Sequence, residues 1–106
     1  MYTDTEIAEC AQAIAKEFEP HRIILFGSHA DGSTNSDSDV DLMVIMPFKG
    51  KSSKMALKIR QSLKKNFPLD LVVKDPTTAN RRIMQGDSFL ENAFRKGKVL
   101  YERTES

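Results

Sequence analysis

Two aspartates, Asp39 and Asp41, alternate with apolar residues at the start of the run 39–45. Alternate residues of a β-strand project from the same face, so we expect both carboxylates on one face of a sheet. Neighbouring carboxylates repel each other and fit poorly in an apolar strand, and a divalent cation that prefers hard oxygen ligands would compensate them. The spacing therefore predicts a divalent cation site.

Gly27-Ser28 follows the apolar run 22–26, which has the length and β-branched content of a strand buried on both faces. Glycine lets a backbone come close to a ligand, and Ser28 is a good N-cap for a short helix at 29–31. Such a turn presents backbone N–H groups that can bind phosphate. A phosphate cradle beside a carboxylate pair describes a site for a metal-bound nucleoside triphosphate.

Gly27-Ser28, ten residues, and then Asp39-Val40-Asp41-Leu42 resemble the signature of the DNA polymerase β-type nucleotidyltransferase superfamily. With three further loop residues in place, the chain most resembles the minimal nucleotidyltransferase (MNT) domains; these residues are Ala30, Gly32 and Ser38. The third carboxylate of that family lies on a later strand, where the run 69–73 offers Asp70. The resemblance covers nearly the whole chain.

The resemblance implies a transferase that moves a nucleoside monophosphate, foremost AMP, from ATP or another nucleoside triphosphate to a hydroxyl group. Asp39 and Asp41 would hold two Mg²⁺ ions, and Asp70 would complete the one that activates the acceptor. Gly27 and Ser28 would bind the β- and γ-phosphates. The resemblance also implies an all-helical partner of the HEPN type, with this chain as the antitoxin of a toxin–antitoxin pair and a tyrosine hydroxyl of the partner as acceptor.

Two alternatives stay open beside the transferase. Asp31 stands where family members commonly carry arginine, which favours a nucleotidyltransferase-like antitoxin that acts by binding alone. A transferase of the antibiotic-modifying kind would need further walls around its substrate, and homo-oligomerisation could supply them. His21 and His29 are expected at the surface, whereas Arg81 and Arg82 are weaker candidates for a triphosphate contact.

Composition narrows the class of protein. A chain of 106 residues is expected to form one domain, 1–106, and a net charge of +1 gives no global footprint for direct nucleic-acid binding. The single cysteine, Cys10, excludes an intrachain disulfide, and we expect it to be a packing residue of the first helix. No apolar run approaches the roughly 20 residues of a membrane span, and the N-terminus lacks signal-peptide features, so we expect a cytoplasmic protein.

The remaining pattern predicts the elements that position these residues. Thr3 and Glu6 form a capping box for a helix that ends before Pro20, and strands follow at 22–26 and 39–46. A helix begins at Ser52 or Ser53 and runs to about 65 with a basic exposed face, followed by a strand at 69–74. Later elements are a helix from 76 to 84, a helix that Ser88 caps and that ends at Gly97, and a short strand at 99–101.

These elements predict the α/β (α+β) class, with a small mixed sheet of three to four strands and the nucleotidyltransferase fold. We expect the helices mainly on one face of the sheet and the carboxylates on the open face.

Overall fold

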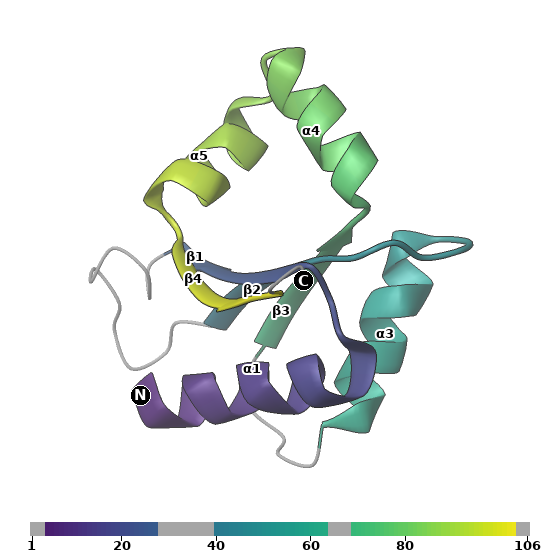
Figure 1. The fold of residues 1–106 in the computed structure, drawn as a ribbon, viewed down its shortest axis with the longest axis vertical. Coiled ribbons are helices and arrows are strands. Elements are labelled where there is room, and N and C mark those ends of the chain that lie inside the picture. Colours follow the sequence, from purple (N-terminus) through teal and green to yellow (C-terminus); the bar gives the residue numbers. More distant parts are fainter. Residues whose placement is uncertain (1–3, 28–39, 64–68, 104–106) are drawn as a thin grey trace.

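The computed structural model describes residues 4–27, 40–63 and 69–103. The elements in chain order are α1 (Asp4–Phe18), β1 (Arg22–Phe26), β2 (Val40–Ile45), α3 (Ser52–Ser62), β3 (Leu69–Lys74), α4 (Pro76–Met84), α5 (Ser88–Lys96) and β4 (Lys98–Glu102) (Figure 1). The helix expected at 29–31 and the capping residue Thr3 lie outside the described residues, as do Ser28, Asp31 and Asp39.

The strands form one mixed sheet in the order β3-β2-β1-β4. β1 is antiparallel to both β2 and β4, whereas β2 and β3 are parallel. A parallel pair needs a crossover between its strands, and α3 lies in the chain between β2 and β3. The predicted class and mixed sheet are confirmed.

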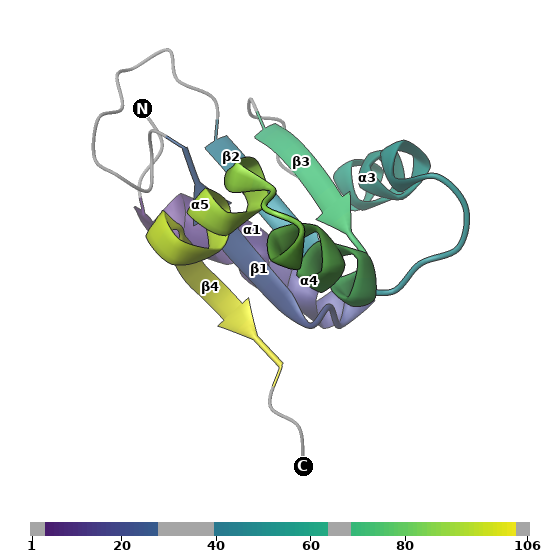
Figure 2. The ribbon, with the colours of Figure 1, turned by 90° about the horizontal axis from the view of Figure 1, so that it is seen from above.

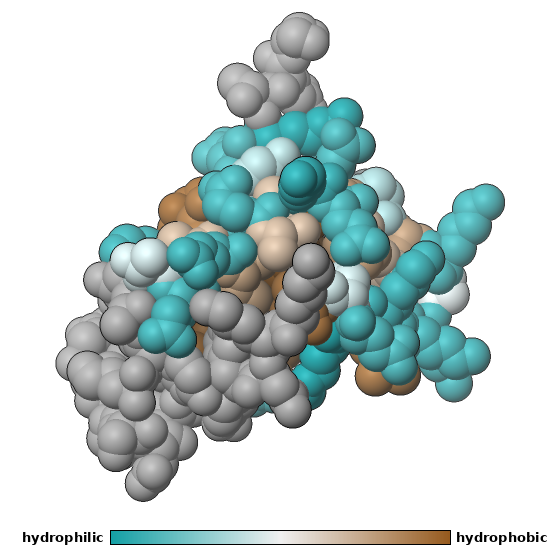
Figure 3. Space-filling view, turned by 90° about the horizontal axis from the view of Figure 1, so that it is seen from below, coloured by the Kyte–Doolittle hydropathy of each residue, from teal (hydrophilic) through white to brown (hydrophobic). Residues whose placement is uncertain are grey.

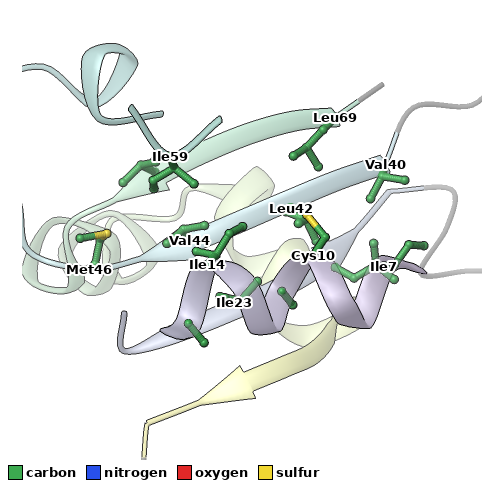
Figure 4. Close-up of a cluster of buried hydrophobic side chains, with 14 residues drawn as sticks. Ile7, Cys10, Ile14, Ile23, Val40, Leu42, Val44, Met46, Ile59 and Leu69 are labelled. Atoms are coloured by element: carbon green, nitrogen blue, oxygen red, sulfur yellow. The ribbon is translucent and has the colours of Figure 1, made fainter. Parts of the chain in front are cut away.

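Helices cover both faces of this sheet (Figures 1 and 2). On one face, α1 and α3 pack over Val40, Leu42 and Val44 of β2 (Figure 4). On the other face, α4 and α5 pack over Met43 and Ile45. This distribution corrects the expectation of helices mainly on one face, because a central strand that is apolar on both sides must be covered on both sides.

The helix ends differ in part from the sequence prediction. Asp75 caps α4 as expected, with its carboxylate accepting bonds from the Thr77 and Thr78 amides at 3.0 and 3.3 Å. At α5 the cap is Asp87 rather than Ser88, because Asp87 Oδ1 accepts from the Leu90 amide at 3.1 Å. The N-cap of α3 is Lys51 without a side-chain bond, so neither predicted serine caps this helix.

The basic stretch around α3 is exposed, as predicted for a solvated face. The described cations from 49 to 60 are all exposed, namely Lys49, Lys51, Lys54, Lys58 and Arg60. Figure 3 shows long hydrophilic side chains on its right, on the side where α3 lies in Figure 1.

Cys10 points into the core between α1 and the sheet (Figure 4) and is only 7% exposed. Its burial raises the pKa of the thiol from 9.0 to about 11, which keeps it protonated at neutral pH. This places Cys10 among packing residues, as expected. In the described parts of the chain, no helix has both the length and the apolar content to cross a bilayer.

Candidate active site

Three side chains lie in one row across the sheet. Phe26, the last residue of β1, is opposite Asp41 of β2, and Asp41 is opposite Asp70 of β3. Neighbouring strands lie about 4.8 Å apart, and residues directly opposite each other share a face. The pairing of β2 with β3 therefore brings the carboxylates of Asp41 and Asp70 together, although they are distant in the sequence.

The row lies on the face that α4 and α5 cover, since Phe26 packs with the buried residues of that side. Asp41 and Asp70 stand at the start of their strands, where this layer gives way to solvent: Asp41 is half-buried and Asp70 is exposed. The carboxylates were expected on a face of the sheet without helices. They lie instead on the face that α4 and α5 cover, at the end of the strands where this cover stops. Because α5 covers this face, it forms a wall of the candidate site.

Gly27 contacts the Asp41 carboxylate. A Cβ added to Gly27 would overlap Asp41 Oδ2, far inside the 3.0 Å that real Cβ atoms keep. Gly27 also has a φ of +78°, a left-handed conformation that side chains disfavour. The turn after β1 therefore requires glycine for its conformation and for the space that the carboxylate occupies.

The donor set fits a divalent cation. Two carboxylates on adjacent strands supply hard oxygen ligands, and their mutual repulsion would be relieved by a cation between them. Among the described residues, no group of three acidic, histidine or cysteine side chains is close enough to bind a metal. The predicted third ligand, Asp39, lies outside those residues, as does Ser28.

A cavity of about 190 Å³ adjoins the row on the side of α5. Its lining includes Phe26 and Gly27 at the end of β1, and Phe89, Asn92 and Lys96 on α5. The rings of Phe26 and Phe89 meet edge to face, with centroids 5.7 Å apart at 88°. Phe89 lies in an amphipathic helix next to the buried Leu90, where an aromatic residue is typical of a core position, so the sequence alone does not indicate this cavity.

The weaker sequence candidates lie elsewhere or are exposed. His21 immediately precedes β1, at the end of the β1–β2 ladder opposite to Asp41, where its amide donates to the Ile45 carbonyl at 2.8 Å. Arg81 and Arg82 are exposed in the last turn of α4, and Arg82 lies 4.0 Å from Asp87 in an ion pair. Such an exposed pair contributes little to stability.

Comparison with known proteins gives a family match and several structural likenesses. Residues 8–106 match the family described as Polymerase beta, Nucleotidyltransferase. No curated relative matches the chain in sequence.

Among solved structures, a protein of Sulfolobus solfataricus assigned as a nucleotidyltransferase is similar at 16% identity, with a TM-score of 0.65 over 92% of this chain and 78% of that one. A toxin–antitoxin structure with AMP-PNP gives 20% identity and a TM-score of 0.56 over 92% and 74% of the two chains. A mutant toxin–antitoxin structure, MntA-HpeT, gives 18% and 0.52 over 97% and 76%. At these identities the likeness establishes a shared fold.

Proposed function

This chain belongs to the polymerase β nucleotidyltransferase family, and on that premise we propose that it transfers a nucleoside monophosphate from ATP or another nucleoside triphosphate to a hydroxyl group of a partner protein. Mg²⁺ is the proposed cofactor, with two ions bound. We take residues 1–106 to form a single nucleotidyltransferase domain that works in the cytoplasm.

The observation that carries the proposal is the contact of Gly27 with Asp41 in the row that Asp70 continues. Two carboxylates on adjacent strands supply the hard oxygen ligands that a divalent cation prefers, and the turn at Gly27 lies directly against one of them. Such a set of ligands beside a glycine turn is expected where a protein binds a metal-bound phosphate.

Each residue has a distinct proposed role. Gly27 and Ser28 would bind the β- and γ-phosphates, Gly27 through its backbone. Asp39, Asp41 and Asp70 would hold Mg²⁺, which when bound promotes ionisation of the attacking hydroxyl and neutralises charge on the leaving pyrophosphate. Ser28 and Asp39 enter this assignment from the sequence signature alone.

In the reaction, the acceptor oxygen forms a bond to the α-phosphorus, the bridging bond to the β-phosphate breaks, and pyrophosphate leaves. Asp70 would take the acceptor proton. Two observations support this role: Asp70 is exposed, and β3 is an edge strand of the four described strands. An acceptor can therefore approach from the β3 side, opposite the wall formed by α5.

The proposed partner is a helical toxin of the HEPN type, with this chain as its antitoxin and a tyrosine hydroxyl as acceptor. The MNT resemblance favours this pairing, and two toxin–antitoxin structures share the fold, one of them with AMP-PNP. Among the described strands β3 is the last of the sheet on the acceptor side, and Asp70 is exposed there, so a partner surface would complete the site.

The test uses ATP labelled separately at the α- and γ-phosphate, incubated with Mg²⁺, this protein and an extract of its own cells. We expect protein label from the α-phosphate alone, and its loss in the Asp39→Asn/Asp41→Asn double variant. Label from the γ-phosphate alone would indicate kinase chemistry. A double variant that labels its acceptor at the wild-type rate would refute the metal assignment.

A second candidate function is an antitoxin that neutralises its partner by binding alone. Asp31 favours it, because a negative charge replaces the usual arginine beside the proposed triphosphate. The triple variant of Asp39, Asp41 and Asp70 to alanine distinguishes the two. Full neutralisation by this variant supports binding alone, whereas loss of neutralisation with an intact complex supports transfer.

A further inference from the structure

The cavity beside Gly27 has the size of a subsite for one small ring system. At about 190 Å³ it is smaller than the roughly 300–1,000 Å³ of pockets that enclose drug-sized ligands. It equals the liquid volume of about six waters. It can therefore take one aromatic heterocycle, while a sugar and phosphates would have to lie outside it.

The aromatic lining suits a planar ligand. Phe89 is 52% exposed, which is unusual for so large an apolar side chain, and its ring is perpendicular to that of Phe26. An exposed ring at the wall of a cavity offers a face for stacking, and stacking of a nucleobase on an aromatic side chain contributes about 1–3 kcal/mol.

Two polar side chains share this wall. Asn92 and Lys96 are four residues apart on α5, so they lie on the same side of the helix, and both line the cavity. Asn92 Oδ1 accepts a hydrogen bond from Arg95 Nη2 at 3.3 Å, and the amide N–H groups of Asn92 can donate to the edge of a base. The Lys96 ammonium adds a positive charge that complements a nearby phosphate.

The position of the cavity is fixed by a second glycine. A Cβ on Gly97 would lie 2.6 Å from Ile24 Cγ2 and 3.0 Å from the Leu25 carbonyl oxygen, so only glycine lets the end of α5 approach β1 this closely. The close approach holds the α5 wall against Phe26 and Gly27. Gly27 is therefore shared between the cavity and the contact with Asp41.

We propose that this cavity, between α5 and the end of β1, binds the base of the nucleotide, with Phe89 stacking on the ring and Asn92 contacting its edge. The inference rests on the proposed nucleotidyltransferase function. It orients the substrate along the row, with the base at α5, the phosphates at Gly27 and Asp41, and the acceptor at Asp70. The rival occupant, an aromatic side chain of the partner protein, is an outcome of the test.

The test measures binding of two probes by calorimetry in Mg²⁺: AMP-PNP, which carries a base, and inorganic tripolyphosphate, which does not. We expect Phe89→Ala to weaken AMP-PNP binding about 5- to 150-fold, the equivalent of 1–3 kcal/mol, and to leave tripolyphosphate binding unchanged. Phe89→Tyr should retain affinity within about twofold, because it keeps the stacking ring.

Leu57→Ala is the matched control. Leu57 is 55% exposed, a fraction similar to that of Phe89, but it lies on α3 and does not line the cavity. It should leave both affinities unchanged. An equal loss of affinity for AMP-PNP and tripolyphosphate in Phe89→Ala would refute a base subsite. Unchanged affinity for AMP-PNP would refute it as well, and would favour a side chain of the partner as the occupant of the cavity. If the wild-type protein binds neither probe, the proposed function itself fails.

Discussion

Replacing Gly27 by alanine separates the two reasons for a glycine at this turn. The first is conformational: a φ of +78° in a residue with a side chain costs about 1–2 kcal/mol. The second is steric: the new Cβ would occupy the space of Asp41 Oδ2, so the carboxylate or the turn must move. A displacement of about 1 Å in a reacting group can lower a rate about 100-fold.

Gly86→Ala provides the matched control. Gly86 has a φ of +91°, but a Cβ there would have no neighbour within 4 Å. Gly86→Ala should therefore show the conformational effect alone, a fall in Tm of about 4–16 °C. Gly27→Ala should lower Tm at least as much and, in addition, reduce nucleotidyl transfer about 100-fold or more, measured with α-labelled ATP below both melting temperatures.

A double-mutant cycle tests the steric part directly. In an Asp41→Ala background the space beside Gly27 is empty, so Gly27→Ala should cost less stability than it does in the wild-type protein, with a coupling of about 0.5–3 kcal/mol. Urea denaturation gives the free energies of unfolding. Transfer by Gly27→Ala at the wild-type rate, or equal inactivation by Gly86→Ala, would refute the reasoning.

Four further predictions concern single sites. Asp70→Asn should reduce the rise in Tm that Mg²⁺ causes, because it removes a charged oxygen ligand opposite Asp41; an undiminished Mg²⁺ effect would exclude Asp70 as a ligand. Asp87→Ala should lower the free energy of unfolding, measured by urea denaturation, by about 1 kcal/mol, and Ser88→Ala should lower it much less. The reverse order would show that Ser88 is the N-cap of α5. Gly97→Ala should be strongly destabilising through its contacts with β1, and a Tm within 2 °C, or about 0.5 kcal/mol, of wild type would contradict that packing. Burial raises the pKa of the Cys10 thiol to about 11, so this thiol should resist iodoacetamide at pH 8 until urea unfolds the chain. Because the pKa is higher in the folded than in the unfolded protein, the free energy of unfolding should be unaffected below pH 9 and should fall as the pH rises from 9 to 11.

Much of the local structure could be predicted because its signals are local. The bounds of β1 and β3 agree with apolar runs that end at Gly27 and at Asp75-Pro76. Asp75 caps α4 because an aspartate before a proline suits both the N-cap and the first helical position. The sequence alone does not identify the cap of α5, because Asp87 and Ser88 are both good caps and only the backbone path decides which side chain reaches the Leu90 amide.

Residue types and short spacings were enough to indicate the family: Gly27-Ser28, the spacing to Asp39 and Asp41, and a later strand aspartate together resemble its signature. The relative positions of these residues depend on the folded chain. The strand register places Asp41 opposite Asp70, and the turn after β1 brings Gly27 into contact with the Asp41 carboxylate. α5, with Phe89, forms one wall of the cavity beside Gly27. Residue types and short spacings are written in a single chain, whereas register and the covering of sheet faces depend on contacts between distant segments, which only the folded protein brings together.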